Sequence, residues 1–304
     1  MATFKRIGVL TSGGDAPGMN AAVRAITRKA LEQGVEVMGI LGGYSGLLED
    51  KVIPMTPTSV SNIINRGGTF LYSDRCLEFK TEAGMQKAIA TCKKYGIEGI
   101  VAVGGDGTFR GATDLALRGI PTIGVTGTID NDITATDYTV GFDTAMNTVL
   151  DAADKLRDTC ESHARCNVLE VMGRDCGLIA LEGGIAAGAI AIAIPEVPFD
   201  EKAAIEDIKK AKANGKRSML VLVSEGVFET LPDGTKVPYG ELLRKRIEAE
   251  TGIETKFARM AHIVRGGSPS LRDRLTATKM GVKAVELLLE GKSNLVVIEE
   301  DGAH

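Results

Sequence analysis

The sequence has no long hydrophobic run, no paired-cysteine motif and no excess of positive charge. No apolar stretch approaches the roughly 18 residues that a transmembrane helix needs. The N-terminal MATFKRIGVL leads directly into a strand-like segment and lacks the apolar core and cleavage site of a signal peptide. We therefore expect a soluble protein in the cytoplasm.

The cysteines form no CxxC pair and no zinc-binding spacing. An odd number of them without a secretion signal predicts free thiols, most of which pack in the core. A net charge of −4 gives no overall field that would attract nucleic acid. An anionic ligand would therefore have to be held by a local cluster of basic residues. The cysteines are Cys76, Cys92, Cys160, Cys166 and Cys176.

What the sequence does contain is an alternation of short β-branched runs with longer amphipathic stretches, which is typical of βαβ units and a parallel sheet. A chain of 304 residues exceeds what one compact core needs, so we expect two lobes with a cleft between them. The predicted strands are RIGVL, VEVMGI, GIVAVGG, PTIGVTG, CNVLEVMG, AIAIAIP, SMLVLVSE and NLVVIE. The predicted helices cover residues 108–118, 141–160, 200–214 and 271–290, and residues 41–57 and 228–239 are predicted as loop insertions.

Three predicted strands end in glycine-rich turns, and ligands of parallel α/β sheets bind at the carboxyl ends of strands. In VLTSGGDAPGMNAAVR, Gly13 and Gly14 precede a helix that begins near Pro17. Glycines let the backbone approach a ligand, and helix N-termini favour anions. The segment is not a Walker A loop, because no Gly-Lys-Ser/Thr follows. A plain strand-to-helix turn is the alternative.

The second turn, in IVAVGGDGTFRGA, carries Asp106 among its glycines. Arg110 stands where the third glycine of GxGxxG would be, so a dinucleotide fingerprint is not supported. A carboxylate inside a phosphate-binding turn suggests a cation between the two, and Mg²⁺ prefers one or two carboxylates plus phosphate oxygens and water. Asp106 is therefore the metal candidate, with a helix N-cap as the alternative.

The third turn, in IGVTGTIDNDITATDYTVGFDTA, places Asp130, Asn131 and Asp132 after an apolar strand and Gly127. Phosphoryl transfer requires a carboxylate that accepts or orients the acceptor hydroxyl. Two carboxylates two residues apart can divide this work. An Asx-turn is the alternative for this segment alone.

Basic residues that suit phosphate groups cluster near other strand ends. Arg165 and Arg174 flank CNVLEVMG, and His262 and Arg265 precede a Gly-Gly turn in AHIVRGGSP. Arg75, in LYSDRC, is a further candidate. A single arginine is usually structural or solvated, so it is the clustering that indicates an anion site.

Taken together, TSGGDAPGMNAA, NRGGTF, GGDGT, GTIDND, RDTCESHAR, EVMGR and HIVRGGSP resemble, in this order, the bacterial ATP-dependent 6-phosphofructokinases. The resemblance covers nearly the whole chain. It implies an α/β fold of two Rossmann-like three-layer lobes with mostly parallel sheets and an active site in the cleft between them. It also implies an ATP-binding lobe of residues 1–141 plus about 264–304 and a fructose 6-phosphate lobe of residues 142–263.

The activity implied by the resemblance is transfer of the γ-phosphoryl group of MgATP to the 1-hydroxyl of fructose 6-phosphate, in glycolysis. Asp130 matches the base that activates the hydroxyl, and Asp106 matches the Mg²⁺ ligand. Arg165 matches an arginine that reaches a neighbouring subunit's substrate, which implies a homotetramer. The implied catalytic residues are Asp130, Thr128, Asp132, Arg174 and Arg75; those for ATP are Gly14, Tyr44, Arg75, Cys76, Gly105, Asp106, Gly107 and Thr108; those for the sugar phosphate are Thr128, Ile129, Asp130, Arg165, Met172, Gly173, Arg174, Glu225, Lys256, His262 and Arg265.

Two glycines bear on the phosphoryl donor. Relatives that use pyrophosphate carry aspartate after GGD and lysine before TIDND, which occupy the space of the nucleotide α-phosphate. This chain has Gly107 and Gly127 there, which favours ATP.

The sequence departs from the family pattern in the sugar-phosphate site and in the effector site. Lys256 replaces an arginine that contacts the sugar 6-phosphate, so we expect weaker substrate affinity, and Val264 replaces a usual glutamine. Pro57 replaces an effector-site arginine, Ile190 a glutamate and Asn214 a lysine, so we expect blunted regulation by nucleotide or phosphoenolpyruvate. The effector-site residues that remain are Arg24, Arg28, Arg157 and Lys216.

Three alternatives to this activity remain at this point, and a fourth is excluded. A pyrophosphate-dependent phosphofructokinase shares most motifs. A lipid or NAD kinase shares GGDGT, although TIDND and HIVRGGSP argue against it. A catalytically silent subunit that binds sugar phosphate is disfavoured by the intact carboxylates and Arg174. A dehydrogenase is excluded, because the sequence lacks GxGxxG with a following acidic residue.

Overall fold

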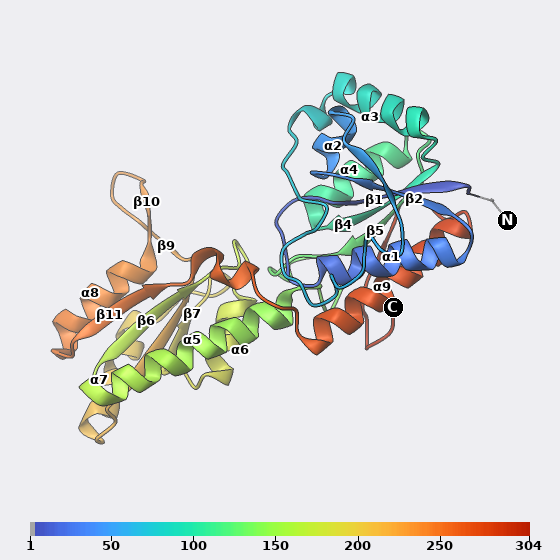
Figure 1. Ribbon diagram of the computed structural model, residues 1–304. Helices are drawn as coiled ribbons and strands as arrows, with labels where there is room; N and C mark the ends of the chain where they lie inside the picture. The colour runs from blue at the N-terminus through green and yellow to red at the C-terminus, as the bar shows by residue number, and fades with distance from the viewer. Residues whose placement is uncertain (1–3) are drawn as a thin grey trace. The chain divides into compact units, whose positions relative to one another are not determined.

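The computed structural model describes residues 4–304 (Figure 1). The chain divides into two compact units. The first comprises Met1–Ile129, Ile133–Thr144 and Arg265–His304, and the second comprises Asp130–Asp132 and Ala145–Val264. The predicted 1–141 lobe begins with three residues that lie outside the described part of the chain.

The first unit is built on a six-stranded sheet in the order β12-β5-β4-β1-β2-β3. Neighbouring strands are parallel except β3, which pairs antiparallel with β2. Every residue of β4 and β5 is buried, which explains why these strands are continuous apolar runs in the sequence. The strands are β1 (Arg6–Thr11), β2 (Glu36–Ile40), β3 (Val52–Met55), β4 (Gly99–Gly104), β5 (Thr122–Thr126) and β12 (Leu295–Val297).

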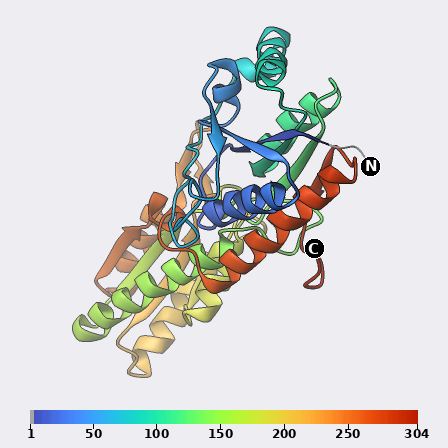
Figure 2. The ribbon, with the colours of Figure 1, turned by 45° about the vertical axis from the view of Figure 1, so that its right-hand side comes forward.

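Helices cover both faces of this sheet (Figures 1 and 2). On one face α1 (Met19–Glu32) packs along α9 (Leu271–Leu289), and Figure 2 shows the two side by side. Gly281 allows this approach, because a Cβ there would lie 2.9 Å from Ala25 Cβ. The helices on the other face share one apolar core with the sheet. They are α2 (Tyr44–Leu48), η1 (Glu78–Lys80), α3 (Glu82–Tyr95) and α4 (Asp106–Ala116).

The second unit contains a four-stranded parallel sheet in the order β11-β6-β8-β7. Side chains of α7 and α8 form its main apolar core with the sheet. The strands are β6 (Cys166–Val171), β7 (Ala191–Ala193), β8 (Met219–Ser224) and β11 (Thr255–Arg259). The helices are α5 (Phe142–His163), α6 (Leu178–Ala186), α7 (Glu201–Ala213) and α8 (Tyr239–Thr251), and the turn η2 covers Ala261–Arg265.

The predicted α/β class with mostly parallel sheets is confirmed, but two predicted loops are wrong. Residues 41–57 contain α2 and β3, and residues 228–239 contain a hairpin of β9 (Phe228–Thr230) and β10 (Lys236–Pro238). These strands have three or four residues and are partly exposed, so they lack the apolar runs that mark the central strands. The edge strand β11 is also mostly exposed or half-buried and lacks an apolar run, so the sequence pattern does not predict it.

The cysteines are free thiols, as the sequence predicts, and three of them are buried. Within residues 4–304 no helix combines the length and the apolar character that crossing a membrane requires.

Candidate active site

The first glycine-rich turn joins β1 to α1 and lies against a buried arginine. Gly13 and Gly18 have φ of +84° and +109°, which favour glycine. A Cβ at Gly14 would lie 2.7 Å from Nη1 of Arg265, and the same nitrogen donates to the carbonyl of Asp15 at 3.4 Å. The turn therefore holds a cation directly against its glycine backbone, an arrangement that suits an anionic ligand.

The second turn interlocks with the first. Thr108 Oγ1 donates to the Ser12 carbonyl at 3.0 Å, and the Ser12 amide donates to the Val103 carbonyl at 3.0 Å. A Cβ at Gly104 would come within 2.3 Å of Thr108 Oγ1 and 2.5 Å of the Ser12 oxygen. The contact therefore requires glycine, and the two turns form one hydrogen-bonded structure.

Asp106 is the first residue of α4, not its N-cap. Gly105 occupies the cap position and no side chain caps the helix, so the N-cap alternative is wrong. The Asp106 side chain is 67% exposed and pairs with Arg110 at 2.8 Å. An exposed ion pair of this kind contributes only about 0.3–0.5 kcal/mol to stability. The Asp106 carboxylate can therefore leave Arg110 at little cost and bind another partner. Sequence reasoning missed this pair, although the i,i+4 spacing in a helix could have revealed it.

The donor set around Asp106 fits Mg²⁺ shared with a phosphate. Among the described residues no group of three or more histidine, cysteine, aspartate or glutamate side chains could hold a metal alone. One exposed carboxylate at a helix N-terminus, where phosphates bind, matches the preference of Mg²⁺ for few carboxylates plus phosphate oxygens and water.

The segment that carries Arg75 is fastened to the first turn. The Asn20 side chain accepts from the Phe70 amide at 2.6 Å, and Ser73 Oγ donates to a carbonyl of the first turn at 2.5 Å. Arg75 is exposed and Cys76 is half-buried. Both side chains therefore stand on a loop whose position is set by the glycine-rich turn.

Tyr44 lies beneath the second turn. Its ring stacks on Phe79 with centroids 4.1 Å apart, and its hydroxyl donates to the Thr108 carbonyl at 2.6 Å. The side chain is 5% exposed, and burial raises the pKa of its hydroxyl. Tyr44 thus supports the second turn, and its contact with a nucleotide stays a prediction.

The third turn follows β5 and runs beside the second. The Gly127 amide donates to the Gly104 carbonyl at 2.9 Å, and Thr139 Oγ1 donates to the Thr128 carbonyl at 2.7 Å. A Cβ at Gly105 would lie 3.7 Å from Thr128 Cβ. The structure therefore brings Thr128 to the second turn, while Ile129 is fully buried behind it.

The two glycines that bear on the donor differ in their surroundings. A Cβ at Gly107 would meet no heavy atom within 4 Å, whereas one at Gly127 would lie 3.2 Å from Met19 and from Val103. Gly107 therefore faces open space, and Gly127 is tightly packed between α1 and β4.

In the second unit, Asp130 lies beside Arg174. Asp130 Oδ2 is 4.0 Å from Arg174 Nη2, and the two side chains are 4% and 59% exposed. Glu225 Oε1 accepts from the amides of Gly173 and Arg174, at 3.3 and 3.0 Å. A Cβ at Gly226 would lie 2.2 Å from the Arg174 carbonyl. Glu225, after β8, thus holds the backbone of Arg174, after β6, and the exposed Arg174 guanidinium lies next to the buried carboxylate of Asp130.

Two other predicted cations are paired with one acid. Arg165 and Lys256 contact Glu254 at 2.6 and 2.8 Å. Hydrogen bonds from Arg165, the larger effect, and from Lys256 lower the pKa of Glu254 to about 2. Met172 is half-buried after β6, and His262 is exposed in η2.

The predicted effector residues are distributed over both units. Arg24 and Arg28 lie on α1, whereas Lys216 is exposed after α7. Arg157, on α5, donates to the Ala187 carbonyl. Ile190, where a glutamate is usual, packs on the core of the second unit.

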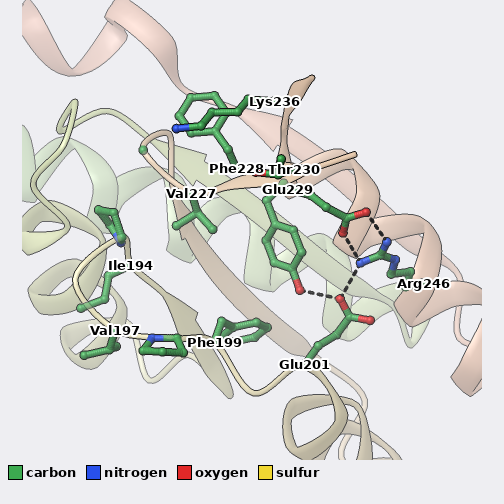
Figure 3. A pocket seen from close by; sticks show the side chains of 14 residues that line it. Ile194, Val197, Phe199, Glu201, Val227, Phe228, Glu229, Thr230, Lys236 and Arg246 are labelled. Atoms are coloured by element: carbon green, nitrogen blue, oxygen red, sulfur yellow. Dashed lines mark hydrogen bonds and ion pairs between the residues drawn. The ribbon is translucent and has the colours of Figure 1, made fainter. Parts of the chain in front are cut away.

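A cavity of about 600 Å³ in the second unit contains none of the predicted site residues (Figure 3). Arg246 contacts Glu229 at 2.7 Å and Glu201 at 2.9 Å, and the Tyr239 hydroxyl donates to Glu201 at 2.5 Å. Arg246 thus bridges two carboxylates and fastens the β9–β10 hairpin to α7 and α8. Sequence reasoning missed the cavity because its lining follows no motif.

Comparison with known proteins shows which family contains chains with this sequence. Residues 6–288 match the family described as Phosphofructokinase. The ATP-dependent 6-phosphofructokinase 1 of Clostridium perfringens is 53% identical over 294 residues, covering 97% of this chain and 89% of the relative. The ATP-dependent 6-phosphofructokinase of Bacillus subtilis is 54% identical with the same coverage.

Solved structures agree with the sequence comparison. Phosphofructokinase from Saccharomyces cerevisiae has a TM-score of 0.87 and 34% identity, covering 94% of this chain but 42% of the yeast chain. A pyrophosphate-dependent phosphofructokinase from Marinobacter aquaeolei has a TM-score of 0.83, 24% identity and coverage of 95% of this chain and 77% of the other, which shows the fold alone. This chain belongs to the phosphofructokinase family.

Proposed function

We propose that this chain transfers the γ-phosphoryl group of ATP to the 1-hydroxyl of fructose 6-phosphate, giving fructose 1,6-bisphosphate and ADP in glycolysis. The proposal is carried by the buried carboxylate of Asp130 beside the exposed guanidinium of Arg174, in a chain more than half identical to ATP-dependent 6-phosphofructokinases. Transfer of a phosphoryl group to an acceptor hydroxyl needs a base for the hydroxyl proton and a cation for the charge on the phosphoryl oxygens.

The first unit is the proposed ATP-binding lobe, which we take as residues 1–141 and about 264–304. Its interlocked turns offer glycine backbone and helix N-termini to the phosphates. Asp106 is the proposed Mg²⁺ ligand, and the bound ion would neutralise charge on the phosphoryl oxygens. The other proposed ATP contacts are Gly14, Tyr44, Arg75, Cys76, Gly105, Gly107 and Thr108.

In the proposed reaction Asp130 accepts the proton of the 1-hydroxyl as that oxygen bonds to the γ-phosphorus and the bond to the ADP oxygen breaks. General-base assistance of this kind contributes about 10²–10⁴-fold in rate. Arg174 and Arg75 stabilise charge on the transferred group, and Thr128 and Asp132 orient the hydroxyl.

Residues 142–263 form the proposed fructose 6-phosphate lobe. Arg174 and Glu225, which the strand ends hold together, would line the sugar site. We further propose a cytoplasmic homotetramer, in which Arg165 and Lys256 would leave Glu254 to meet a neighbour's substrate. Ile190 and Pro57 would weaken the effector site. The other proposed sugar-phosphate contacts are Ile129, Met172, Gly173, His262 and Arg265.

A coupled assay tests this function with fructose 6-phosphate as acceptor and either ATP or pyrophosphate as donor. We expect turnover with MgATP only. Asp130→Ala should lose about 10²–10⁴-fold in kcat, while Asp151→Ala, which removes an exposed carboxylate paired with Lys155, should keep wild-type kcat. Turnover with pyrophosphate alone would favour the pyrophosphate-dependent alternative, and binding of fructose 6-phosphate without turnover would favour a silent subunit.

A further inference from the structure

Asp273, on the first turn of α9, has no solvent exposure, which is unusual for a carboxylate. Its Oδ1 accepts from the Tyr138 hydroxyl and from the Gly141 amide at 2.6 Å. Its Oδ2 accepts from the amide of Thr144 at 2.9 Å and from the hydroxyl of the same residue. Four donors of the segment 138–144 therefore converge on one side chain.

Helix capping does not account for this arrangement. Ser270 is the N-cap of α9, and its hydroxyl accepts from the Asp273 amide at 3.2 Å. In a capping box the acidic side chain would return to the amide of the cap residue. Here the Ser270 amide donates to Thr144 Oγ1 at 2.9 Å instead, so the carboxylate is directed to the segment 138–144.

The segment 138–144 in turn pairs with the end of β5. The Val140 amide donates to the Thr126 carbonyl at 3.3 Å, and Val140 forms a parallel bridge with Gly127. Thr139 Oγ1 donates to the Thr128 carbonyl at 2.7 Å. The backbone that carries Thr128 therefore rests on the segment that Asp273 holds.

The same segment also packs on the first glycine-rich turn. A Cβ at Gly18 would lie 2.5 Å from Val140 Cγ1, and a Cβ at Gly141, whose φ is +112°, would lie 2.6 Å from Ala16 Cβ. A shift of the segment would therefore displace both the first turn and the end of β5.

We propose that Asp273 is a positioning residue for phosphoryl transfer: by collecting the donors of residues 138–144 it fixes the backbone of Thr128 and of the first turn. This inference rests on the proposed function. Asp273 touches no reacting group, so it acts only through the placement of others.

Asp273→Asn tests the proposal without changing the volume of the side chain. The amide nitrogen of asparagine is a donor, so it would face donors of Gly141 or Thr144 and force the segment to shift. A displacement of about 1 Å near reacting groups can reduce the rate by about 10²-fold. We expect kcat to fall about 10- to 100-fold and KM for ATP to rise, because the displaced first turn is also part of the proposed ATP site, while KM for fructose 6-phosphate should change by less than about threefold. Amides of residues 127–129 should exchange hydrogen faster than in the wild type.

Thr122→Val is the matched control. Thr122 is a buried residue of β5 whose hydroxyl donates to the Ala112 carbonyl at 2.9 Å, away from the segment 138–144. It should lower Tm and leave kcat of the folded enzyme unchanged. If Asp273→Asn does not fold, Tyr138→Phe decides, because it removes one of the four donors and should lower kcat about two- to fivefold at unchanged KM for fructose 6-phosphate.

The outcomes separate the inference from the function. An active wild type with kcat of Asp273→Asn within twofold, or a parallel loss of kcat in Thr122→Val at similar Tm, would overturn the inference alone. If Asp273→Asn does not fold, an unaltered kcat in Tyr138→Phe would overturn the inference. A wild type without activity on fructose 6-phosphate and ATP would overturn the proposed function together with the inference.

Discussion

Replacing Gly107 with aspartate should weaken the binding of ATP while leaving the fold intact. A Cβ at Gly107 meets no heavy atom within 4 Å, and the residue lies in the first turn of α4, where an acidic side chain is favourable. The new side chain also replaces a flexible glycine. We therefore expect the free energy of unfolding to stay the same or to rise by up to about 1 kcal/mol.

The expected loss of ATP binding can be estimated from charge repulsion. A carboxylate at Gly107 would stand beside Asp106, at the turn where the ATP phosphates are proposed to bind. For an effective dielectric constant of about 20–40, like unit charges at about 6 Å repel by about 1.4–2.8 kcal/mol. This corresponds to about a 10- to 100-fold lower kcat/KM for ATP.

The assay compares initial rates for Gly107→Asp and Gly107→Asn over a range of MgATP concentrations at saturating fructose 6-phosphate. Asparagine has nearly the same size as aspartate but no charge, so Gly107→Asn should lower kcat/KM for ATP less than about threefold. Equal losses of kcat/KM for ATP in the two variants would show a steric effect and refute charge repulsion. A wild-type KM for ATP in Gly107→Asp would refute it as well.

Three further predictions concern packing, pH and thiol reactivity. Gly104→Ala, whose Cβ would lie 2.5 Å from the Ser12 carbonyl, should cost about 1–3 kcal/mol in the free energy of unfolding by denaturant titration; an unchanged midpoint would contradict it. Because the pKa of Glu254 falls from 4.5 to about 2 on folding, its stabilising effect is complete above pH about 4.5 and is lost toward pH 2, so Tm in Glu254→Gln should depend less on pH in this range; equal slopes would argue against the pairing. Burial raises the pKa of Cys92 and Cys166 to about 12, so both thiols should resist Ellman's reagent at pH 8 until unfolding, and rapid labelling of the native protein would refute this.

The parts of the fold that the sequence predicts are those with strong local patterns. The strands β4 and β5 are buried on both faces and therefore appear as uninterrupted apolar runs. The helix predicted at 200–214 is observed as Glu201–Ala213, with Asp200 as its N-cap. By contrast, β3 contains Pro54 at a sheet edge, and β11 has only one buried residue, Thr255, so neither resembles a central strand.

The candidate site shows the same division. The glycine-rich turns and Asp106 are recognisable because a few adjacent residues define them. The hydrogen bond between Gly141 and Asp273 joins residues 132 positions apart, and nothing in the local sequence around Asp273 marks it as more than part of a helix N-terminus. Long-range polar contacts of this kind depend on how α9 returns to the first unit, which local propensity does not determine.

The most direct test of the account is the transfer reaction itself, followed as fructose 1,6-bisphosphate formed from fructose 6-phosphate and MgATP by the wild type and by Asp130→Ala at equal folded concentration. We expect product from the wild type and a kcat lower by about 10²–10⁴-fold in the variant. Equal turnover by the two proteins would contradict the role of Asp130, and absence of product from the folded wild type would contradict the proposed function.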